Sequence, residues 1–66
     1  MQVKYPDIEV ELSGQDGNAF AIVGAVTKAM RSHKVPNDEI DAFRQEAMSG
    51  DYDNLLRTAL QWVSVS

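Results

Sequence analysis

Two short polar turns contain the residues of this chain that are best suited to chemistry. The first turn, Ser13 to Asn18, reads SGQDGN and leads into an apolar segment. A phosphate can bind at the start of a helix where glycines allow close approach and backbone N–H groups are free. This turn has glycines, but it lacks the lysine and hydroxyl residue of a P-loop and the G-x-G-x-x-G spacing. We therefore predict a turn in which Asp16 or Asn18 caps a helix.

The second polar turn, Gly50 to Asn54, reads GDYDN and carries the paired carboxylates Asp51 and Asp53. A calcium-binding loop would also need a glycine and a glutamate at fixed later positions, and these are missing. We predict instead that Asp51 caps a helix and that Gly50 ends the preceding helix in a left-handed conformation. Tyr52 lies between the two carboxylates, and tyrosine is often an anchor of protein interfaces.

His33 is the only histidine, and the chain contains no cysteine. The usual zinc sites therefore cannot form within one chain, and no Cys–His or Ser–His–Asp arrangement is recognisable. A general base would also need a nearby carboxylate to orient it, whereas the neighbours of His33 are Lys28, Arg31 and Lys34. We interpret this cluster as the charged end of a helix. The sequence predicts no catalytic residue, no metal site and no cofactor.

An acidic face is expected on the first strand, where the sequence DIEVEL alternates strictly between acidic and apolar residues. The apolar residues, which should face a core, are Ile8, Val10 and Leu12. The outward residues are Asp7, Glu9 and Glu11. They would follow one another at about 6.6 Å, which is close to the phosphate spacing along a DNA strand. The face is either a solvated surface that protects a sheet edge from aggregation or a surface that enters a nucleic-acid-binding cleft.

Hydrophobic spacing predicts a first helix over residues 19–34. Its apolar stripe consists of Phe20, Val23, Thr27 and Met30, widened by Ile22 and Val26. Gly24 lies inside this helix, where glycine destabilises by up to about 1 kcal/mol relative to alanine. We expect Gly24 to allow close approach of a neighbouring element.

Two further helices and a final strand are expected. The second helix begins after Pro36 with Asn37 as its cap, and it ends at the sequence MSGD. Its stripe is Ile40, Phe43 and Ala47. The third covers residues 52–62, with apolar positions at Leu55, Leu56, Ala59 and Leu60. From about Trp62 we predict a short strand that pairs with the first strand, with Trp62 in the core.

Length and composition favour a small α+β domain over residues 1–66, with an N-terminal strand, three helices and a short C-terminal strand. A chain of this length without disulfides has little core, so we expect oligomerisation, most simply a homodimer. The net charge of −4 favours a partner with a basic surface over direct DNA binding. No apolar run could cross a bilayer, and the N-terminal residues are unlike a signal peptide, so a cytosolic protein is expected.

Three stretches, taken together, resemble a known group of proteins. They are YPDIEVELSGQDGNAF, VPNDEIDAFRQEAMSGDYDNLL and WVSVS. The chain is similar over nearly its whole length to short uncharacterised proteins of phages, prophages and bacterial mobile elements, most distinctively at DGNAF and SGDYDNLL. This resemblance implies a phage or mobile-element setting and no catalytic residue. Small acidic proteins of that setting commonly act by binding: they block a host enzyme, disable a defence complex or sequester a signalling molecule.

Two functional hypotheses follow. The first is a non-enzymatic protein that binds and modulates a host protein, such as a defence or nucleic-acid-processing complex. The alternative is a protein that binds a small anionic ligand, such as a nucleotide, through backbone N–H groups at Gly17, Asn18 or Gly50. The candidate partner-binding residues are Asp7, Glu9, Glu11, Asp16, Asn18, Asp51 and Tyr52.

Overall fold

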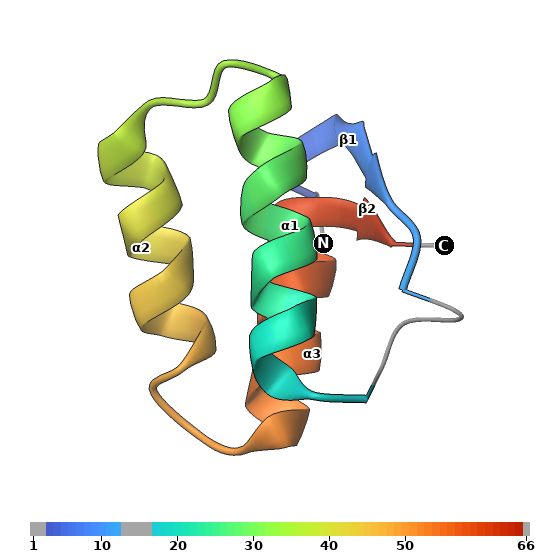
Figure 1. Ribbon diagram of the computed structural model, residues 1–66, viewed down its shortest axis with the longest axis vertical. Helices are drawn as coiled ribbons and strands as arrows, with labels where there is room; N and C mark the ends of the chain where they lie inside the picture. The colour runs from blue at the N-terminus through green and yellow to red at the C-terminus, as the bar shows by residue number, and fades with distance from the viewer. Residues whose placement is uncertain (1–2, 13–16, 66) are drawn as a thin grey trace.

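The chain forms two strands and three helices in the order that its sequence predicts. The computed structural model describes residues 3–12 and 17–65. Its elements are β1 (Tyr5–Val10), α1 (Ala19–Ser32), α2 (Asn37–Ala47), α3 (Tyr52–Trp62) and β2 (Val63–Val65). The helices run alternately up and down beside one another, and the sheet packs at one side of them (Figure 1). The predicted α+β fold is therefore confirmed.

The first and last strands pair with each other, as predicted, and they run parallel. A parallel pair needs a long crossover connection, and here the three helices supply it. The register pairs Tyr5 with Val63, and then Glu9 with Ser64 and Val10 with Val65. The intervening residues of β1 bulge out of the ladder, and the Ser64 hydroxyl donates a 2.8 Å hydrogen bond to the Pro6 carbonyl beside the bulge.

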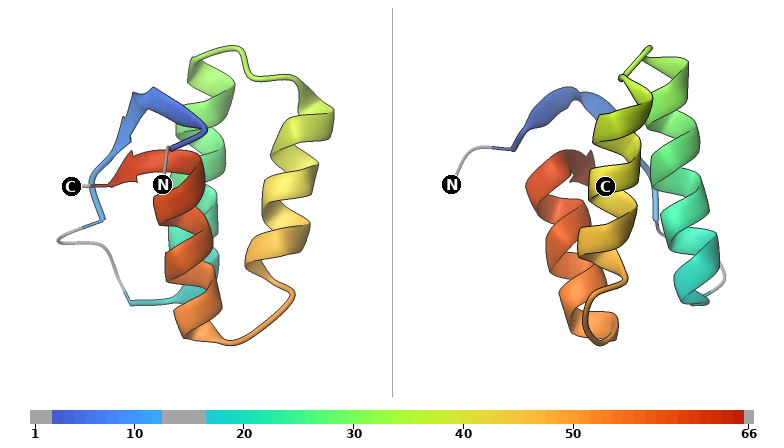
Figure 2. Two further views of the ribbon diagram at one scale, coloured as in Figure 1. Left: turned by 180° about the vertical axis from the view of Figure 1, so that it is seen from behind. Right: turned by 90° about the vertical axis from the view of Figure 1, so that its left-hand side faces the viewer.

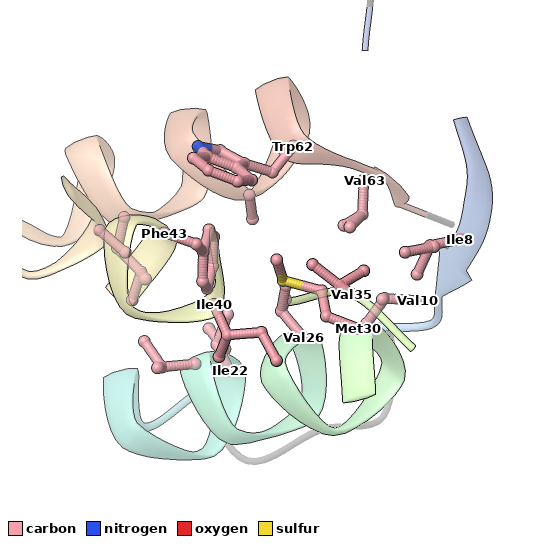
Figure 3. Close-up of a cluster of buried hydrophobic side chains, with 14 residues drawn as sticks. Ile8, Val10, Ile22, Val26, Met30, Val35, Ile40, Phe43, Trp62 and Val63 are labelled. Carbon is pink, nitrogen blue, oxygen red and sulfur yellow. The ribbon is translucent and has the colours of Figure 1, made fainter. Parts of the chain in front are cut away.

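One hydrophobic core joins all five elements. Met30 and Val26 from α1 point toward Val63 at the start of β2, and Ile8 reaches the same region from β1 (Figure 3). The alternation predicted for the first strand is confirmed, because Ile8 and Val10 are buried while Asp7, Glu9 and Glu11 are exposed. Trp62 is also buried, as predicted, where the end of α3 meets β1.

The apolar face of α1 is narrower than its sequence suggests. The buried residues of α1 are Ile22, Val23, Val26, Thr27 and Met30. Phe20, which we placed in the same stripe, is 74% exposed. The expectation for Gly24 was also wrong, since a side chain at that position would meet nothing within 4 Å. Open space at Gly24 means that no neighbouring element approaches it.

The first helix ends two residues earlier than predicted, in a Schellman motif. Lys34 has a φ of 63°, the left-handed conformation that usually favours glycine. Its N–H donates to the Arg31 carbonyl, and the Val35 N–H donates to the Met30 carbonyl, each at 3.0 Å. Val35 and Met30 are both buried, which supplies the hydrophobic contact that usually accompanies this motif.

The start of α2 differs from the prediction. Pro36 occupies the N-cap position, and no side chain caps the helix. Asn37, which we predicted as the cap, is the first residue of α2, because the carbonyl of the extended Pro36 (ψ 148°) already accepts the first helical hydrogen bonds, from the N–H groups of Glu39 and Ile40. The predicted stripe of Ile40, Phe43 and Ala47 is buried.

Among the residues that the structure describes, no helix is long and apolar enough to span a membrane.

Candidate functional site

The start of α1 is built by Asn18. Its side-chain oxygen accepts a 2.8 Å hydrogen bond from the Phe20 N–H, and its carbonyl accepts from the N–H groups of Ala21 and Ile22. Asn18 is therefore one of the two predicted caps, whereas Asp16 lies outside the described residues. The cap therefore holds the backbone of Phe20, whose side chain is exposed, in the first turn of α1.

The turn between α2 and α3 is held by its own polar side chains. Asp51 caps α3, as predicted, and accepts a 2.9 Å hydrogen bond from the Asn54 N–H. The Asn54 amide donates in turn to the Glu46 carbonyl at 2.9 Å, and the Ser49 hydroxyl donates to the same carbonyl at 2.7 Å. These bonds satisfy the exposed end of α2. Most of the motif SGDYDN is thus explained by the geometry of a tight helical hairpin.

Gly50 is required in this turn for a reason that we did not predict. It has no left-handed conformation, and α2 instead ends at Met48 with a φ of −95°. A Cβ atom at Gly50 would lie 3.0 Å from Cβ of Asn54. The absence of a side chain at Gly50 therefore makes room for Asn54, which bonds the end of α2.

Gly17 and Asn18, the last two residues of the first polar turn, lie at the same end of the molecule as the second polar turn, where α1 begins, α2 ends and α3 begins (Figure 1, lower end). A Cβ atom at Gly17 would lie 4.0 Å from the Tyr52 hydroxyl, so Gly17 lies close to the start of α3. We call residues 17–20 and 48–53 the helix-start end. The fold thus brings together Asn18, Asp51 and Tyr52, which are distant in sequence.

Exposed apolar side chains are concentrated at the helix-start end. The described residues include four large apolar side chains classed as exposed, and three of them belong to this end: Phe20 (74% exposed), Met48 (46%) and Tyr52 (42%). The fourth is Leu60, on α3. Large exposed aromatic and apolar side chains are typical anchors of protein-binding sites. The carboxylates of Asp51 and Asp53, in the same segment as Met48 and Tyr52, are exposed as well.

The chemistry of this end favours a protein over an anionic ligand. The cap side chains of Asn18 and Asp51 already accept from N–H groups in the first turns of α1 and α3. The carboxylates of Asp51 and Asp53 would also repel a phosphate. Nor do the described residues contain a group of three or more His, Cys, Asp or Glu side chains that could hold a metal ion.

The acidic strand face forms a second, separate surface. Asp7, Glu9 and Glu11 are exposed, and the last two line a shallow hollow of about 330 Å³ between β1 and α1. The far wall of this hollow is the second half of α1, from Ala25 to Ser32, and it includes Lys28. The six candidate residues that the structure describes therefore fall into two groups, because the helix-start end lies at the opposite end of α1.

An ionic and aromatic cluster at the start of β1 has no counterpart in our sequence predictions. The Lys4 ammonium lies 2.7 Å from a Glu39 carboxylate oxygen, and the Tyr5 hydroxyl donates to the same oxygen at 3.0 Å. The Lys4 ammonium also lies 4.2 Å from the centre of the Trp62 ring, which stacks on Tyr5 at 6.2 Å. The Trp62 indole N–H donates to Glu46 at 3.3 Å. We call these residues the β1 clamp.

The β1 clamp shifts three pKa values. The hydrogen bond to Glu39 raises the pKa of Lys4, and hydrogen bonds from Lys4 and then Tyr5 lower the pKa of Glu39. Burial, followed by the hydrogen bond to Glu39, raises the pKa of Tyr5. Because each group is engaged in holding β1 against α2 and α3, we interpret the clamp as structural.

The basic cluster near the end of α1 is exposed. Lys28 and Arg31 belong to the helix, His33 is its C-cap residue, and Lys34 follows in the left-handed conformation. Positive charge at this position is favourable because the C-terminal end of a helix dipole is negative.

Comparison with protein-family models, with curated proteins and with solved structures found no match.

Proposed function

We propose that this chain is a non-enzymatic accessory protein of a phage or mobile element that acts in the host cytosol by binding and modulating a host protein. The observation that carries the proposal is that three large exposed apolar residues, Phe20, Met48 and Tyr52, all belong to the helix-start end. Aromatic residues and methionine are enriched at protein interfaces. Asp51 and Asp53 beside them, together with a net charge of −4, favour a partner whose apolar pocket is rimmed by basic residues.

The acidic strand face is proposed as a second contact with the same partner. Its carboxylates would steer a basic surface toward the protein. Self-association as a homodimer is also part of the proposal, because a domain of this size has a small core.

Affinity capture of the tagged protein from host lysate, followed by mass spectrometry, tests this function. We expect one enriched host protein, and we expect the double variant Phe20→Ala/Met48→Ala to lose at least about tenfold in affinity for it, since exposed anchors dominate binding energy. Leu60→Ala is the matched control, because Leu60 is also exposed (54%) but lies outside the helix-start end. Full capture by the double variant would refute this end as the binding surface.

A charge-reversal variant tests the acidic strand face separately. Replacing Asp7, Glu9 and Glu11 with lysine should leave the fold intact, since all three are exposed, and should abolish capture of the partner. Asp41→Lys on the exposed side of α2 is the control. If the triple variant captured the partner normally, the strand face would have no part in binding.

Binding of a small anion remains the alternative function. A nucleotide present at about a hundred times its dissociation constant would stabilise the protein by roughly 2.7 kcal/mol, which a thermal-shift panel detects. We expect no shift, because the carboxylates at the helix-start end oppose an anion.

A further inference from the structure

We propose that the β1 clamp contains a binding site for an arginine side chain of the partner. The site consists of Trp62, Glu39 and Glu46, and the side chain of Lys4 fills it in the free protein. This inference names a basic group that the proposed partner presents, and in this respect it rests on the proposed function. The site is separate from the helix-start end, because Trp62 is the last residue of α3 and the helix-start end contains the first residues of α3.

One face of α2 presents two carboxylates to the Trp62 ring. Glu39, Phe43 and Glu46 are spaced by four and then three residues, so they lie on one side of the helix. The rings of Phe43 and Trp62 meet edge to face with their centres 5.8 Å apart (Figure 3). Glu46 accepts from the indole N–H at 3.3 Å, and Glu39 binds Lys4. The indole ring is therefore held in place beside two carboxylates.

A cation already lies in this site. The Lys4 ammonium is 4.2 Å from the centre of the Trp62 ring and 2.7 Å from a carboxylate oxygen of Glu39. An aromatic face attracts a cation, and a carboxylate forms strong charge-assisted hydrogen bonds with it. The hydrogen bond to Glu39 raises the pKa of Lys4, and the charges of Glu39 and Glu46 act in the same direction. The site therefore favours a positive charge.

Arginine fits this site better than lysine does. Lys4 and Tyr5 both bind the same oxygen of Glu39, Oε1. A planar guanidinium can stack on an indole ring and can donate two parallel hydrogen bonds to a carboxylate, so it can also reach the second oxygen of Glu39. The Lys4 side chain is 49% exposed, so a partner can approach the site where Lys4 now lies. Charge thus selects a basic side chain, and shape selects arginine.

Displacement of Lys4 leaves the core intact. Lys4 directly precedes β1, whereas the buried residues of β1, Ile8 and Val10, lie farther along the strand. The β1–β2 ladder is irregular between Tyr5 and Glu9, so the start of β1 can shift while Ile8 and Val10 stay in place. Lys4 therefore competes with any external ligand. The apparent dissociation constant rises as the fraction of molecules with an empty site falls.

Titration with Nα-acetyl-arginine methylamide, followed by tryptophan fluorescence at constant ionic strength, tests the site. Trp62 is the only tryptophan of the chain, so the signal reports this site alone. We expect a saturable change for Lys4→Ala, and a dissociation constant at least about threefold higher for the wild type, because Lys4 competes there. The citrulline analogue has nearly the same shape without the charge and should give no saturable change. Circular dichroism checks the fold, and Lys4→Gln is the second variant without the competing charge.

Two further variants test the role of Glu39. In the Lys4→Ala background, Glu39→Gln should abolish the response, and Glu9→Gln, an exposed acid of β1 outside the clamp, should preserve it. A folded Lys4→Ala or Lys4→Gln protein that gives no response would overturn the proposal, as would an equal response to the citrulline analogue or a response that survives Glu39→Gln. The titration contains no host protein, so its failure is distinct from a failure of partner capture.

Discussion

At the scale of single residues, Lys34 adopts a backbone conformation that is unfavourable for a residue with a side chain. It holds a φ of 63°, which costs a residue with a Cβ atom roughly 1 kcal/mol or more relative to glycine. We therefore expect Lys34→Gly to raise the free energy of unfolding by up to about 1 kcal/mol, measured by urea denaturation. Lys28→Gly, inside α1, is the control and should destabilise by about 1 kcal/mol. A loss of stability in Lys34→Gly would show that the lysine side chain contributes more than the strain it causes.

The helix caps show how far sequence reasoning extends at this scale. Asn18 and Asp51 were predicted correctly, because each precedes a helix and has a short side chain that reaches back to an N–H group. Asn37 also has a short side chain that could cap a helix, but Pro36 occupies the N-cap position and Asn37 is the first residue of α2. Nothing local indicated a left-handed Lys34, because glycine or asparagine usually fills that position.

At the scale of elements, a glycine inside a helix and a glycine in a turn have opposite effects on stability. Gly24 is exposed within α1 and has open space around it, so Gly24→Ala should stabilise by up to about 1 kcal/mol through helix propensity. Gly50→Ala should destabilise, because the new methyl group would press on Asn54 at 3.0 Å and disturb the bond that ends α2. Thermal unfolding of both variants beside the wild type measures the two effects. Equal shifts in the same direction would contradict this assignment.

The elements themselves were largely predictable, and their faces were less so. Periodicity placed all three helices and both strands. It also put Phe20 and Leu60 with the buried residues, yet both are exposed. Spacing identifies a helix face only to within a residue on either side, and which neighbours cover the flanking positions depends on the packing of distant segments. Because the packing of distant segments is not visible in the sequence, we predicted two separate polar turns and not that Asn18, Asp51 and Tyr52 lie at one end of the molecule.

At the scale of the whole molecule, the β1 clamp makes stability depend on pH. The pKa of Glu39 is lowered from its ordinary value of 4.5, so its contribution is present above that value and is lost as the pH falls through the lowered pKa. The pKa values of Lys4 and Tyr5 are raised from 10.5 and 10.0, so their contributions are lost as the pH rises through the raised values. Stability should therefore be greatest between these limits.

Glu39→Gln tests the clamp as a unit, because this change removes the charge and nearly preserves the shape. We expect a lower melting temperature than the wild type at neutral pH and a smaller difference once the pH has fallen through the lowered pKa of Glu39, where Glu39 of the wild type is protonated as well. Glu9→Gln, exposed on β1, serves as the control. A difference that stayed constant across the acid range would exclude the ion pair as its cause.

The pairing of Tyr5 with Val63 has a consequence for how the protein folds during synthesis. The first strand leaves the ribosome early, but it has no strand partner until Val63–Val65 have emerged, after all three helices. Ile8 and Val10 therefore cannot be fully buried at this stage, whereas the helical segments, whose contacts are more local, begin to assemble. Pairing of β1 with β2 should therefore be the last step of folding, because it joins the two segments of the sheet that lie farthest apart in the sequence.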